Sequence, residues 1–477
     1  MNSLQNYLKS IKNKRVAVVG AGISNTPLIE LLLTAGIDTT VCDKQTREEL
    51  GETAGKFEKA GAKLRLGDDY LENLKEDIIF STPGLMPANP ALKEAVARGS
   101  ILTSEMEVFF DVCPCKIIAI TGSDGKTTTT SIIAEILKND GKTVHIGGNI
   151  GNPLLSNAGN MKPDDYAVIE LSSFQLITMQ KSPDIAVVTN MSPNHLDIHS
   201  NMEEYIKAKG NIFLHQQQSN RAVFNLDNNI TRDYAKDASA GEVLFFSRLV
   251  KVETGVYLHK GIIYDSKSGI ETEIMSASDI ILPGVHNIEN YLSAFAALSG
   301  VASRDSMIKT AKTFSGVQHR LELVRELHGV KYYNDSIASS PSRAIAGLKA
   351  FTETGDDESL KGKRNVILIA GGKDKGIAFD EFGDEVAKGV KTVVLTGKTA
   401  DMIRLAVENS SFYDCNGSPD SPAIMQSSDF EEAVHLASKT AKEGDIVLLS
   451  PACTSFDMFK NFEHRGNEFK NIIKRLV

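Results

Sequence analysis

The 477-residue sequence has no tryptophan, only five cysteines and no long apolar run. The missing tryptophan excludes no function. No Cys-x-x-Cys pair is present, and an odd number of cysteines without a secretion signal favours reduced thiols. Cys113 and Cys115 flank a single proline. This spacing is too tight for a typical zinc pair, so we interpret the segment as part of a linker.

A membrane-spanning helix needs roughly 18 to 20 apolar residues in succession, and no stretch approaches this length. Residues 1–10 also lack the apolar core of a signal peptide. The formal net charge of −9 and the lack of a long basic block argue against nucleic acid as the main partner. We therefore expect a cytoplasmic globular protein that does not enter the membrane, and its length suggests about three domains.

Residues 116–130 carry the most informative pattern. Residues 116–120 are mostly β-branched and apolar, which predicts a buried strand, and 131–137 have helical spacing. Between them lies Thr-Gly-Ser-Asp-Gly-Lys-Thr-Thr. Glycines let backbone N–H groups approach phosphate oxygens at a helix start, Lys126 adds positive charge, and the hydroxyl of Thr127 suits Mg²⁺. The pattern predicts a nucleotide phosphate site.

This loop is shorter than the usual G-x-x-x-x-G-K-[ST] loop. Gly122 and Gly125 frame it, and Ile120 stands where the first glycine belongs. The alternative is an ordinary glycine-rich turn whose lysine is solvated. The predicted strand and helix on either side favour the nucleotide site.

The N-terminal part predicts a Rossmann-like β-α-β unit. Residues 15–20 and 39–43 have strand patterns, a helix is expected over 26–34, and the second strand ends in Asp43. Asn25 replaces the third glycine of the dinucleotide fingerprint, so the match to NAD-binding proteins is weak. Another nucleotide diphosphate at the same helix end is favoured.

A further strand is expected over 77–81, and a turn containing Gly84 follows it. Ligands collect at the carboxyl edge of an α/β sheet, although an ordinary tight turn is an equal alternative. A helix is expected over 90–98.

Two polar residues follow predicted strands of the central part. Glu170 ends the strand 166–170, a position where phosphate-loop proteins hold Mg²⁺, or else it is a helix cap or a solvated strand end. His195 follows the strand 185–190 beside the predicted phosphate edge, whereas a lone histidine is more often structural.

Two pairs of residues are placed by helical spacing. Lys207 and Lys209 lie two positions apart on a helix expected over 202–214, so one should point inward and the other into water. Asn287 and Asn290 share a face, three positions apart, in a predicted loop that enters a helix near residue 292.

From about residue 316 strands and helices alternate again, which predicts a second open α/β sheet. Its strands are expected over 331–335, 365–370, 392–396 and 445–450. Residues 351–363 are rich in glycine and charge and predict a surface loop. The domain boundaries we expect are 1–112, 113–316 and 317–477.

Seven motifs together resemble one known family. They are Gly-Ser-Asp-Gly-Lys-Thr-Thr (122–128), Glu-Leu-Ser-Ser-Phe-Gln-Leu (170–176), Asn-His-Leu-Asp (194–197), Pro-Gly-Val-His-Asn (283–287), His-Arg (319–320), Asn-Asp-Ser (334–336) and the stretch 450–468. Over essentially its whole length the chain resembles the Mur ligases of peptidoglycan synthesis. Several motifs are shared with folylpolyglutamate synthases, and the last stretch most resembles the Mur ligases that add D-glutamate.

The resemblance implies three α/β domains and an ATP-dependent amide ligase. The domains would be a Rossmann-like N-terminal domain for the UDP substrate, a central P-loop ATPase-type domain and a Rossmann-like C-terminal domain for the amino acid. The carboxylate of UDP-MurNAc-L-alanine would attack the γ-phosphate of ATP, and the amine of D-glutamate would then attack the resulting acyl phosphate. Such chemistry needs positive charge around an in-line phosphoryl transfer. We expect two Mg²⁺ ions and a monomer.

The family pattern also implies roles for individual residues. Expected to bind the nucleotide are Gly122, Ser123, Asp124, Gly125, Lys126, Thr127, Thr128, Asn287, Asn290, Arg320 and Asp335. Expected as metal ligands are Thr127, Glu170, His195 and a carbamylated Lys209, because a carbamate turns a cation that repels Mg²⁺ into an anion that helps to hold it. Expected as catalytic residues are Lys126, His195, Lys209, Arg320 and Asp335. The last two would reach the nucleotide when the third domain closes.

Two further groups would hold the other substrates. Expected against the UDP substrate are Gly22, Ile23, Ser24, Asp43, Gly84 and Asn149. Expected against D-glutamate are Ser339, Lys375, Ser455 and Phe462. Ile337 stands where some family members carry a lysine, which leaves the contacts near Ser339 open, and Thr82 replaces a simpler turn without expected consequence.

Two other hypotheses stay open. The chain could be a different amide ligase of this fold, such as a sister Mur enzyme or a folate polyglutamylase. It could also be a non-catalytic nucleotide-binding protein, which would bind ATP without turnover. Release of ADP and phosphate with a panel of amino-acid substrates separates the three.

Overall fold

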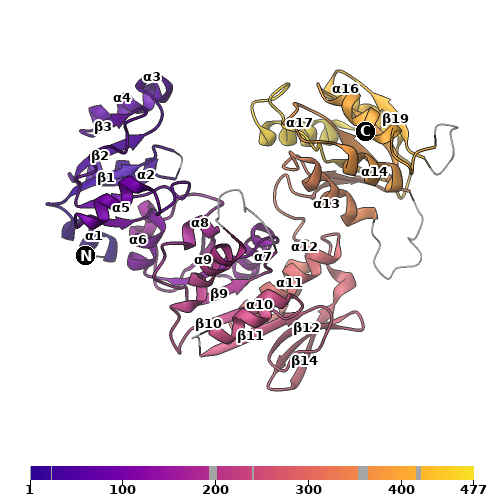
Figure 1. Cartoon of the computed structure of the whole chain (residues 1–477). Helices are drawn as coiled ribbons and strands as arrows, with labels where there is room; N and C mark the ends of the chain where they lie inside the picture. The colour runs from indigo at the N-terminus through magenta and orange to yellow at the C-terminus, as the bar shows by residue number, and fades with distance from the viewer. Residues whose placement is uncertain (1, 23, 193–200, 239–240, 353–363, 415–420) are drawn as a thin grey trace. The chain divides into compact units, whose positions relative to one another are not determined.

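The computed structural model describes residues 2–22, 24–192, 201–238, 241–352, 364–414 and 421–477. It contains three α/β sheets (Figure 1). The chain divides into two compact units: unit 1 comprises Met1–Asp279 and Glu289–Lys312, and unit 2 comprises Ile280–Ile288 and Thr313–Val477. Unit 1 holds two of the sheets and unit 2 the third. The division into three domains stays a prediction.

The first sheet is a five-stranded parallel sheet in the order β3-β2-β1-β4-β5. Its strands are β1 (Arg15–Val19), β2 (Asp38–Asp43), β3 (Lys63–Leu66), β4 (Ile78–Phe80) and β5 (Ile101–Thr103). The helices around it are α1 (Ser3–Ser10), α2 (Thr26–Thr34), α3 (Arg47–Leu50), α4 (Glu52–Lys59), α5 (Pro90–Ala97) and α6 (Glu105–Val112). Alternate residues of β1 enter different cores: Val16 and Val18 join one, and Ala17 and Val19 the other. Both faces are therefore covered, as is usual for parallel sheets.

The second sheet has nine strands in the order β14-β13-β12-β11-β10-β9-β6-β8-β7. They are β6 (Lys116–Thr121), β7 (Val144–Gly148), β8 (Tyr166–Glu170), β9 (Ile185–Val188), β10 (Arg221–Asn225), β11 (Glu242–Ser247), β12 (Gly255–His259), β13 (Ile262–Lys267) and β14 (Ile270–Ser276). The pairs from β7 to β12 are parallel, and β12, β13 and β14 are antiparallel.

The helices of this part are α7 (Lys126–Asn139), α8 (Ser173–Leu176), α9 (Met202–Leu214), α10 (Asn229–Tyr234), α11 (Val285–Leu298) and α12 (Arg304–Thr313), with short 3₁₀ turns η1 (Leu155–Asn160), η2 (Ala235–Asp237) and η3 (Ala277–Asp279). The helices alternate with the strands up to β11, and α11 and α12 follow β14. The sequence predictions contain no strand between residues 221 and 276. In β14 the first four side chains are exposed, so its apolar signal is weak.

The third sheet has six strands in the order β15-β16-β20-β17-β18-β19, parallel except for the β15–β16 pair. The strands are β15 (Glu322–Leu327), β16 (Val330–Asn334), β17 (Val366–Ala370), β18 (Val390–Leu395), β19 (Ala423–Gln426) and β20 (Ile446–Leu449). The helices are α13 (Pro341–Thr352), α14 (Asp380–Gly389), α15 (Ala400–Glu408), α16 (Phe430–Thr440) and α17 (Phe462–Arg475). This confirms the predicted open α/β sheet.

One local prediction is wrong. The loop predicted to continue to residue 290 ends at Gly284, and α11 begins at Val285. Gly284 has φ 95°, a left-handed conformation that turns the chain directly into the helix. Asn287 and Asn290 therefore lie in the first two turns of α11. Of the predicted surface loop 351–363, the first two residues end α13 and the others lie outside the described residues.

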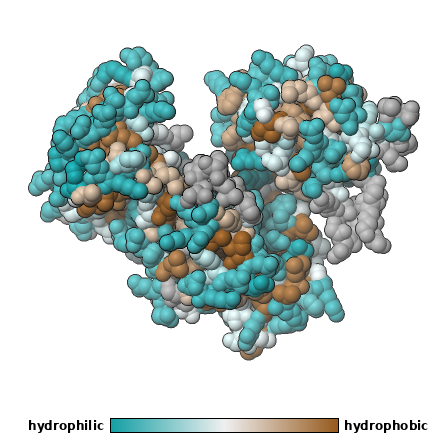
Figure 2. All heavy atoms as spheres, viewed as in Figure 1, coloured by the Kyte–Doolittle hydropathy of each residue, from teal (hydrophilic) through white to brown (hydrophobic). Residues whose placement is uncertain are grey.

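Hydrophilic residues dominate the face seen in Figure 2, and hydrophobic residues appear there as small separate patches. In the described part of the chain, no helix has the length and hydropathy that crossing a membrane requires.

Candidate functional site

The phosphate loop lies between the end of β6 and the start of α7, as predicted. Gly125 is the residue before the helix and has φ 78°, and Gly122 has φ 150°. A Cβ atom at Gly122 would clash with the hydroxyl of Thr189, and one at Gly125 with the side-chain oxygen of Asn290. Both glycines are therefore required by the backbone conformation and by the close approach of neighbouring elements.

The two residues between these glycines are fastened to neighbouring strands and helices. The Ser123 hydroxyl accepts a hydrogen bond from the Ser192 N–H (2.9 Å) and lies 3.0 Å from the hydroxyl of Tyr205. The Asp124 N–H donates to Oδ1 of Asn190 at 2.9 Å. The loop is thus held in shape by the segment after β9 and by α9, which reduces the ordering that a bound phosphate would require.

Two lysines donate to the same carbonyl oxygen of this loop. Nζ of Lys126 lies 3.0 Å from the Gly122 oxygen and 2.9 Å from that of Ser123. Nζ of Lys209, from α9, lies 2.7 Å from the Gly122 oxygen and 3.2 Å from Oγ1 of Thr121. Two ammonium groups at one oxygen repel each other, so the loop concentrates positive charge where an anion would relieve the repulsion.

Lys209 is almost completely buried, with 2% of its surface exposed, whereas Lys207 is exposed. The prediction that one lysine points inward and the other into water is confirmed. Burial, and after it the charge of Lys126, lowers the pKa of Lys209 to about 7, although Glu170 and Asp124 act in the opposite direction. A large fraction of Lys209 is therefore a neutral amine near neutral pH.

Glu170 ends β8 and is 1% exposed, which excludes the alternative of a solvated strand end. Its Oε2 accepts from the Thr127 hydroxyl at 2.7 Å, and its Oε1 from the side-chain amide of Asn149 at 2.8 Å. The Asn149 backbone N–H also donates to the Glu170 carbonyl. One carboxylate thus joins the phosphate helix to the segment that follows β7.

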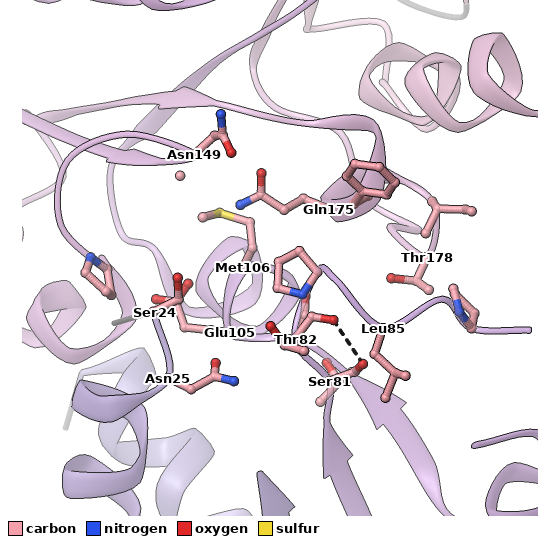
Figure 3. A pocket seen from close by; sticks show the side chains of 18 of the residues that line it. Ser24, Asn25, Ser81, Thr82, Leu85, Glu105, Met106, Asn149, Gln175 and Thr178 are labelled. Atoms are coloured by element: carbon pink, nitrogen blue, oxygen red, sulfur yellow. Dashed lines mark hydrogen bonds between the residues drawn. The ribbon is translucent and has the colours of Figure 1, made fainter. Parts of the chain in front are cut away.

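A pocket of about 270 Å³ opens beside this segment, within unit 1 (Figure 3). Asn149, which follows β7, and Gln175 of α8 lie on one side of it, and Ser24, Asn25 and Ser81, from the segments that follow β1 and β4, lie across from them. Of the residues predicted to bind the UDP substrate, Ser24 and Asn149 line the pocket. Gly22, Asp43 and Gly84 do not line it, and Ile23 lies outside the described residues.

Asp43 acts on the loop after β1. Its Oδ2 accepts from the Ala21 N–H at 2.6 Å, and Oδ1 accepts from the Gln45 N–H at 2.8 Å. Asn25, which breaks the dinucleotide fingerprint, donates to the carbonyls of Val19 and Gly20, both at 3.0 Å. The asparagine side chain thus closes the turn from inside, at the position where the fingerprint has a small residue.

The sequence predictions missed Glu105, which lines the same pocket. It stands at the first position of α6, is 9% exposed, and accepts from the Leu155 N–H at 2.7 Å. Burial raises the pKa of Glu105 to about 6, while hydrogen bonds from Leu155 and Leu154 lower it. No local pattern distinguishes it, because an acidic residue in the first turn of a helix is common.

On α11, Asn290 lies against the phosphate loop, and Oγ1 of Thr129 donates to its side-chain oxygen at 3.3 Å. Asn287 donates to the Pro283 carbonyl at 2.6 Å, across the turn that starts the helix. Asn290 belongs to unit 1 and Asn287 to unit 2.

In unit 2, Asp335 directly follows β16 and is 4% exposed. Its Oδ2 accepts from the Ser450 hydroxyl at 2.8 Å, and its Oδ1 from the Leu321 N–H at 3.3 Å. Burial raises the pKa of Asp335 to about 7, against the hydrogen bonds and the charges of Arg320 and Arg343.

The residues predicted to bind D-glutamate also lie in unit 2, after its strands. The segment with Lys375 pairs with the segment before Ser455 through backbone bonds between Lys373 and Thr454. Lys375 is exposed, and Ser455 is buried. The Phe462 carbonyl accepts from the Ser336 hydroxyl at 2.8 Å, and Ser339 is half-buried.

Comparison with known proteins decides the family. Residues 120–298 match the Mur ligase middle domain, and residues 319–453 match the Mur ligase glutamate ligase domain. The chain belongs to the Mur ligase family. A UDP-N-acetylmuramoylalanine–D-glutamate ligase from Acetivibrio thermocellus is 51% identical over 99% of both chains. One from Ruminiclostridium cellulolyticum is 47% identical over 100% of this chain and 99% of the relative.

Solved structures of Mur ligases share this fold. The UDP-N-acetylmuramate–alanine ligase of Thermotoga maritima aligns with a TM-score of 0.57 at 17% identity, over 97% of this chain and 99% of the other. A UDP-N-acetylmuramoyl-L-alanyl-D-glutamate–2,6-diaminopimelate ligase aligns with a TM-score of 0.52 at 19% identity, over 91% and 85%. The α/β class and the Mur ligase architecture predicted from the sequence are confirmed.

The predicted site residues fall into groups within this Mur ligase fold. Lys126, Thr127, Glu170 and Lys209 meet around one loop of unit 1, together with Asn290. Ser24 and Asn149 line the neighbouring pocket. Arg320, Asp335, Ser339, Lys375, Ser455 and Phe462 belong to unit 2. His195, predicted as a metal ligand, lies outside the described residues.

Proposed function

We propose that this chain joins the amine of D-glutamate to the L-alanyl carboxylate of UDP-N-acetylmuramoyl-L-alanine, with hydrolysis of ATP to ADP and phosphate. Curated relatives of about 50% identity over the full length carry the name of this ligase. The observation that carries the proposal is the meeting of Lys126, Lys209, Thr127 and Glu170 around a loop shaped for phosphate. The reaction proceeds through an acyl phosphate.

Lys126 neutralises charge on the terminal phosphates and leaves its bonds to the loop carbonyls when ATP binds. The loop N–H groups at the start of α7 bind the same oxygens. Asp335 and Arg320 act on the nucleotide, and Lys375, Ser455, Ser339 and Phe462 bind D-glutamate. Asp43 acts on the UDP substrate through the loop after β1, whose backbone it binds, and Gly22 and Ile23 of the same loop bind that substrate. Ser24, Gly84 and Asn149 also contact it.

Thr127 and Glu170 fit a Mg²⁺ site, because a hydroxyl and a buried carboxylate are hard oxygen ligands that already lie 2.7 Å apart. Phosphate oxygens of ATP would supply further ligands to the ion. Bound Mg²⁺ neutralises charge on the phosphates. His195 and the carbamylated form of Lys209 would hold a second ion.

The lowered pKa of Lys209 supports this carbamylation, because only a neutral amine attacks CO₂. We also propose that the chain acts in the cytoplasm as a monomer, with three domains that comprise residues 1–112, 113–316 and 317–477. Carbon-13 NMR with labelled bicarbonate tests the modification: a carbamate resonance is expected in the native protein and in Lys207→Arg, and its absence from the native protein would contradict it.

A panel of amino-acid substrates tests the activity. ADP and phosphate should appear only when UDP-N-acetylmuramoyl-L-alanine and D-glutamate are both present. Turnover with L-lysine, diaminopimelate or a D-alanyl dipeptide instead would assign the chain to another ligase of this fold. ATP binding without turnover under every condition would indicate a non-catalytic protein.

A further inference from the structure

The linker between α6 and β6 brings two thiols together. Cys113 is the residue after the last turn of α6, and Cys115 directly precedes β6, with Pro114 between them. Their sulfur atoms lie 3.4 Å apart, and Sγ of Cys113 lies 3.5 Å from the Cys115 carbonyl oxygen. The sequence spacing suggested only a linker. The backbone between the helix and the strand folds this spacing into a contact between the two thiols.

We propose that Cys113 and Cys115 form a reversible dithiol–disulfide pair, a modification site for low-molecular-weight disulfides. This inference goes beyond the proposed ligase activity and does not depend on it. The pair needs only a short movement, because the two sulfurs are already in contact and belong to one short segment. A pair so close in sequence loses little chain entropy when it is joined.

The two thiols differ in a way that suits sequential attack. Cys113 is partly exposed, whereas Cys115 is 7% exposed. The hydrogen bond from the Cys115 thiol holds the pKa of Cys113 below its usual value, although burial and the charge of Asp184 oppose this. The same contact, with burial, raises the pKa of Cys115. The accessible sulfur is therefore the more readily ionised one, and thiolates are the attacking species.

The reaction balances with the small disulfide as oxidant. The Cys113 thiolate attacks one sulfur of the small disulfide, which forms a mixed disulfide and releases one small thiolate. The Cys115 thiol loses its proton to solvent and attacks the Cys113 sulfur, which releases the second small thiolate. The protein loses two electrons and two protons, and the small disulfide becomes two thiols.

The other described cysteines do not offer this arrangement. Cys42 is completely buried on β2, and burial raises its pKa to about 12. Cys453 is 2% exposed, and burial raises its pKa to about 11. Both thiols are buried and have a raised pKa, so they are poor nucleophiles. The reaction should therefore be confined to the linker.

Glutathione disulfide and mass spectrometry test the proposal on the full chain, in a Cys415→Ser background that removes the cysteine outside the described residues. After oxidation and alkylation of the remaining thiols, the peptide with residues 113–115 should have lost two hydrogens, carry no adduct, and return to the dithiol with dithiothreitol. Cys115→Ser should keep one glutathione on Cys113. Cys113→Ser should react at least about tenfold more slowly.

Three results would overturn the proposal. They are a stable glutathione adduct on Cys113 when Cys115 is present, no reaction of Cys113 in Cys115→Ser, and faster reaction of Cys42 or Cys453 than of Cys113. Cys115→Ala serves as a second variant, and thermal unfolding of each variant shows whether it is folded. Loss of ligase activity is not a readout, so failure of the proposed function leaves this test intact.

Discussion

Lys209 in unit 1 and Asp335 in unit 2 have charged forms of opposite sign, and burial shifts the pKa of both toward neutral pH. Each is at most 4% exposed, and burial is the largest cause that moves its pKa to about 7, down from 10.5 for the lysine and up from 3.8 for the aspartate. Burial disfavours the charged form of either group. Both residues are therefore held near the point of losing their charge at neutral pH.

The neighbours make the difference. Lys209 lies beside the like charge of Lys126, which reinforces the effect of burial. Asp335 lies near the opposite charges of Arg320 and Arg343, which oppose it. The charges next to Lys209 are thus of both signs, because Lys126 adds to the effect of burial and Glu170 and Asp124 oppose it, whereas Arg320 and Arg343 both oppose the effect of burial on Asp335. Such perturbed groups are typical of functional sites.

The effect on stability has opposite signs for the two residues. The unfolded chain binds more protons than the folded one at Lys209 between about pH 7 and 10.5, so this residue makes stability rise with pH in that window. The folded chain binds more protons at Asp335 between 3.8 and about 7, so stability falls as pH rises there.

Removing Lys126 should have the largest effect on turnover, and it should reduce the difference between the surroundings of Lys209 and Asp335. In Lys126→Ala we expect turnover to fall by about 10³-fold or more, because the charge that we propose to bind the transferred phosphate is lost. The pKa of Lys209 should rise at the same time, because its repelling neighbour is gone. Steady-state kinetics and NMR titration measure the two effects. Lys138→Ala, at the other end of α7, is the control, and near-native turnover of Lys126→Ala would contradict the role.

Replacing Lys209 by arginine tests whether a neutral amine is required there. Arginine stays protonated, so Lys209→Arg keeps the positive charge and cannot be carbamylated. We expect turnover to fall by about 10²-fold, close to the effects seen when metal-site geometry is disturbed. Lys207→Arg, two positions away on the exposed face of α9, should turn over normally. Equal turnover of the two variants would show that the reaction does not depend on Lys209.

Asn149 orients Glu170, one of the two carboxylates that oppose the pKa shift of Lys209. In Asn149→Ala, Oε1 of Glu170 loses its amide partner, and the Mg²⁺ concentration for half-maximal rate should rise by about tenfold. The KM for the UDP substrate should rise as well, because Asn149 lines the pocket. Asn139→Ala, whose amide bonds Thr310 far along α7, is the control. An unchanged Mg²⁺ dependence would exclude the orienting role.

Asp335→Asn should have the smallest effect, which concerns stability. The variant removes a buried charge that costs the native chain up to about 4 kcal/mol above pH 7, by the size of the shift. Its melting temperature relative to the native chain should be several degrees higher at about pH 8 than at about pH 5. Asp374→Asn, on an exposed segment, should behave like the native chain at both. A difference independent of pH would mean that Asp335 does not titrate as inferred.

Patterns of neighbouring residues were sufficient for much of this protein. The helices Thr26–Thr34 and Met202–Leu214 and the strand Tyr166–Glu170 are found with the predicted bounds, because each has a clear period and a clear end. The phosphate loop was predictable because its glycines, lysine and threonine are adjacent in sequence. The family resemblance then directed attention to Lys209 rather than Lys207.

The other features of the site depend on the tertiary structure. It brought Lys209 to the carbonyl of Gly122, 87 residues away in sequence, to which Lys126, only 4 residues away, also donates. It buried Glu105 against the N–H of Leu155, 50 residues away. It also turned Cys113 and Cys115 from a spacer into a sulfur contact. Local sequence determines backbone propensity and periodicity, whereas burial and the charge of distant neighbours set the ionisation of a side chain, and these exist only after the strands have paired and the helices have packed.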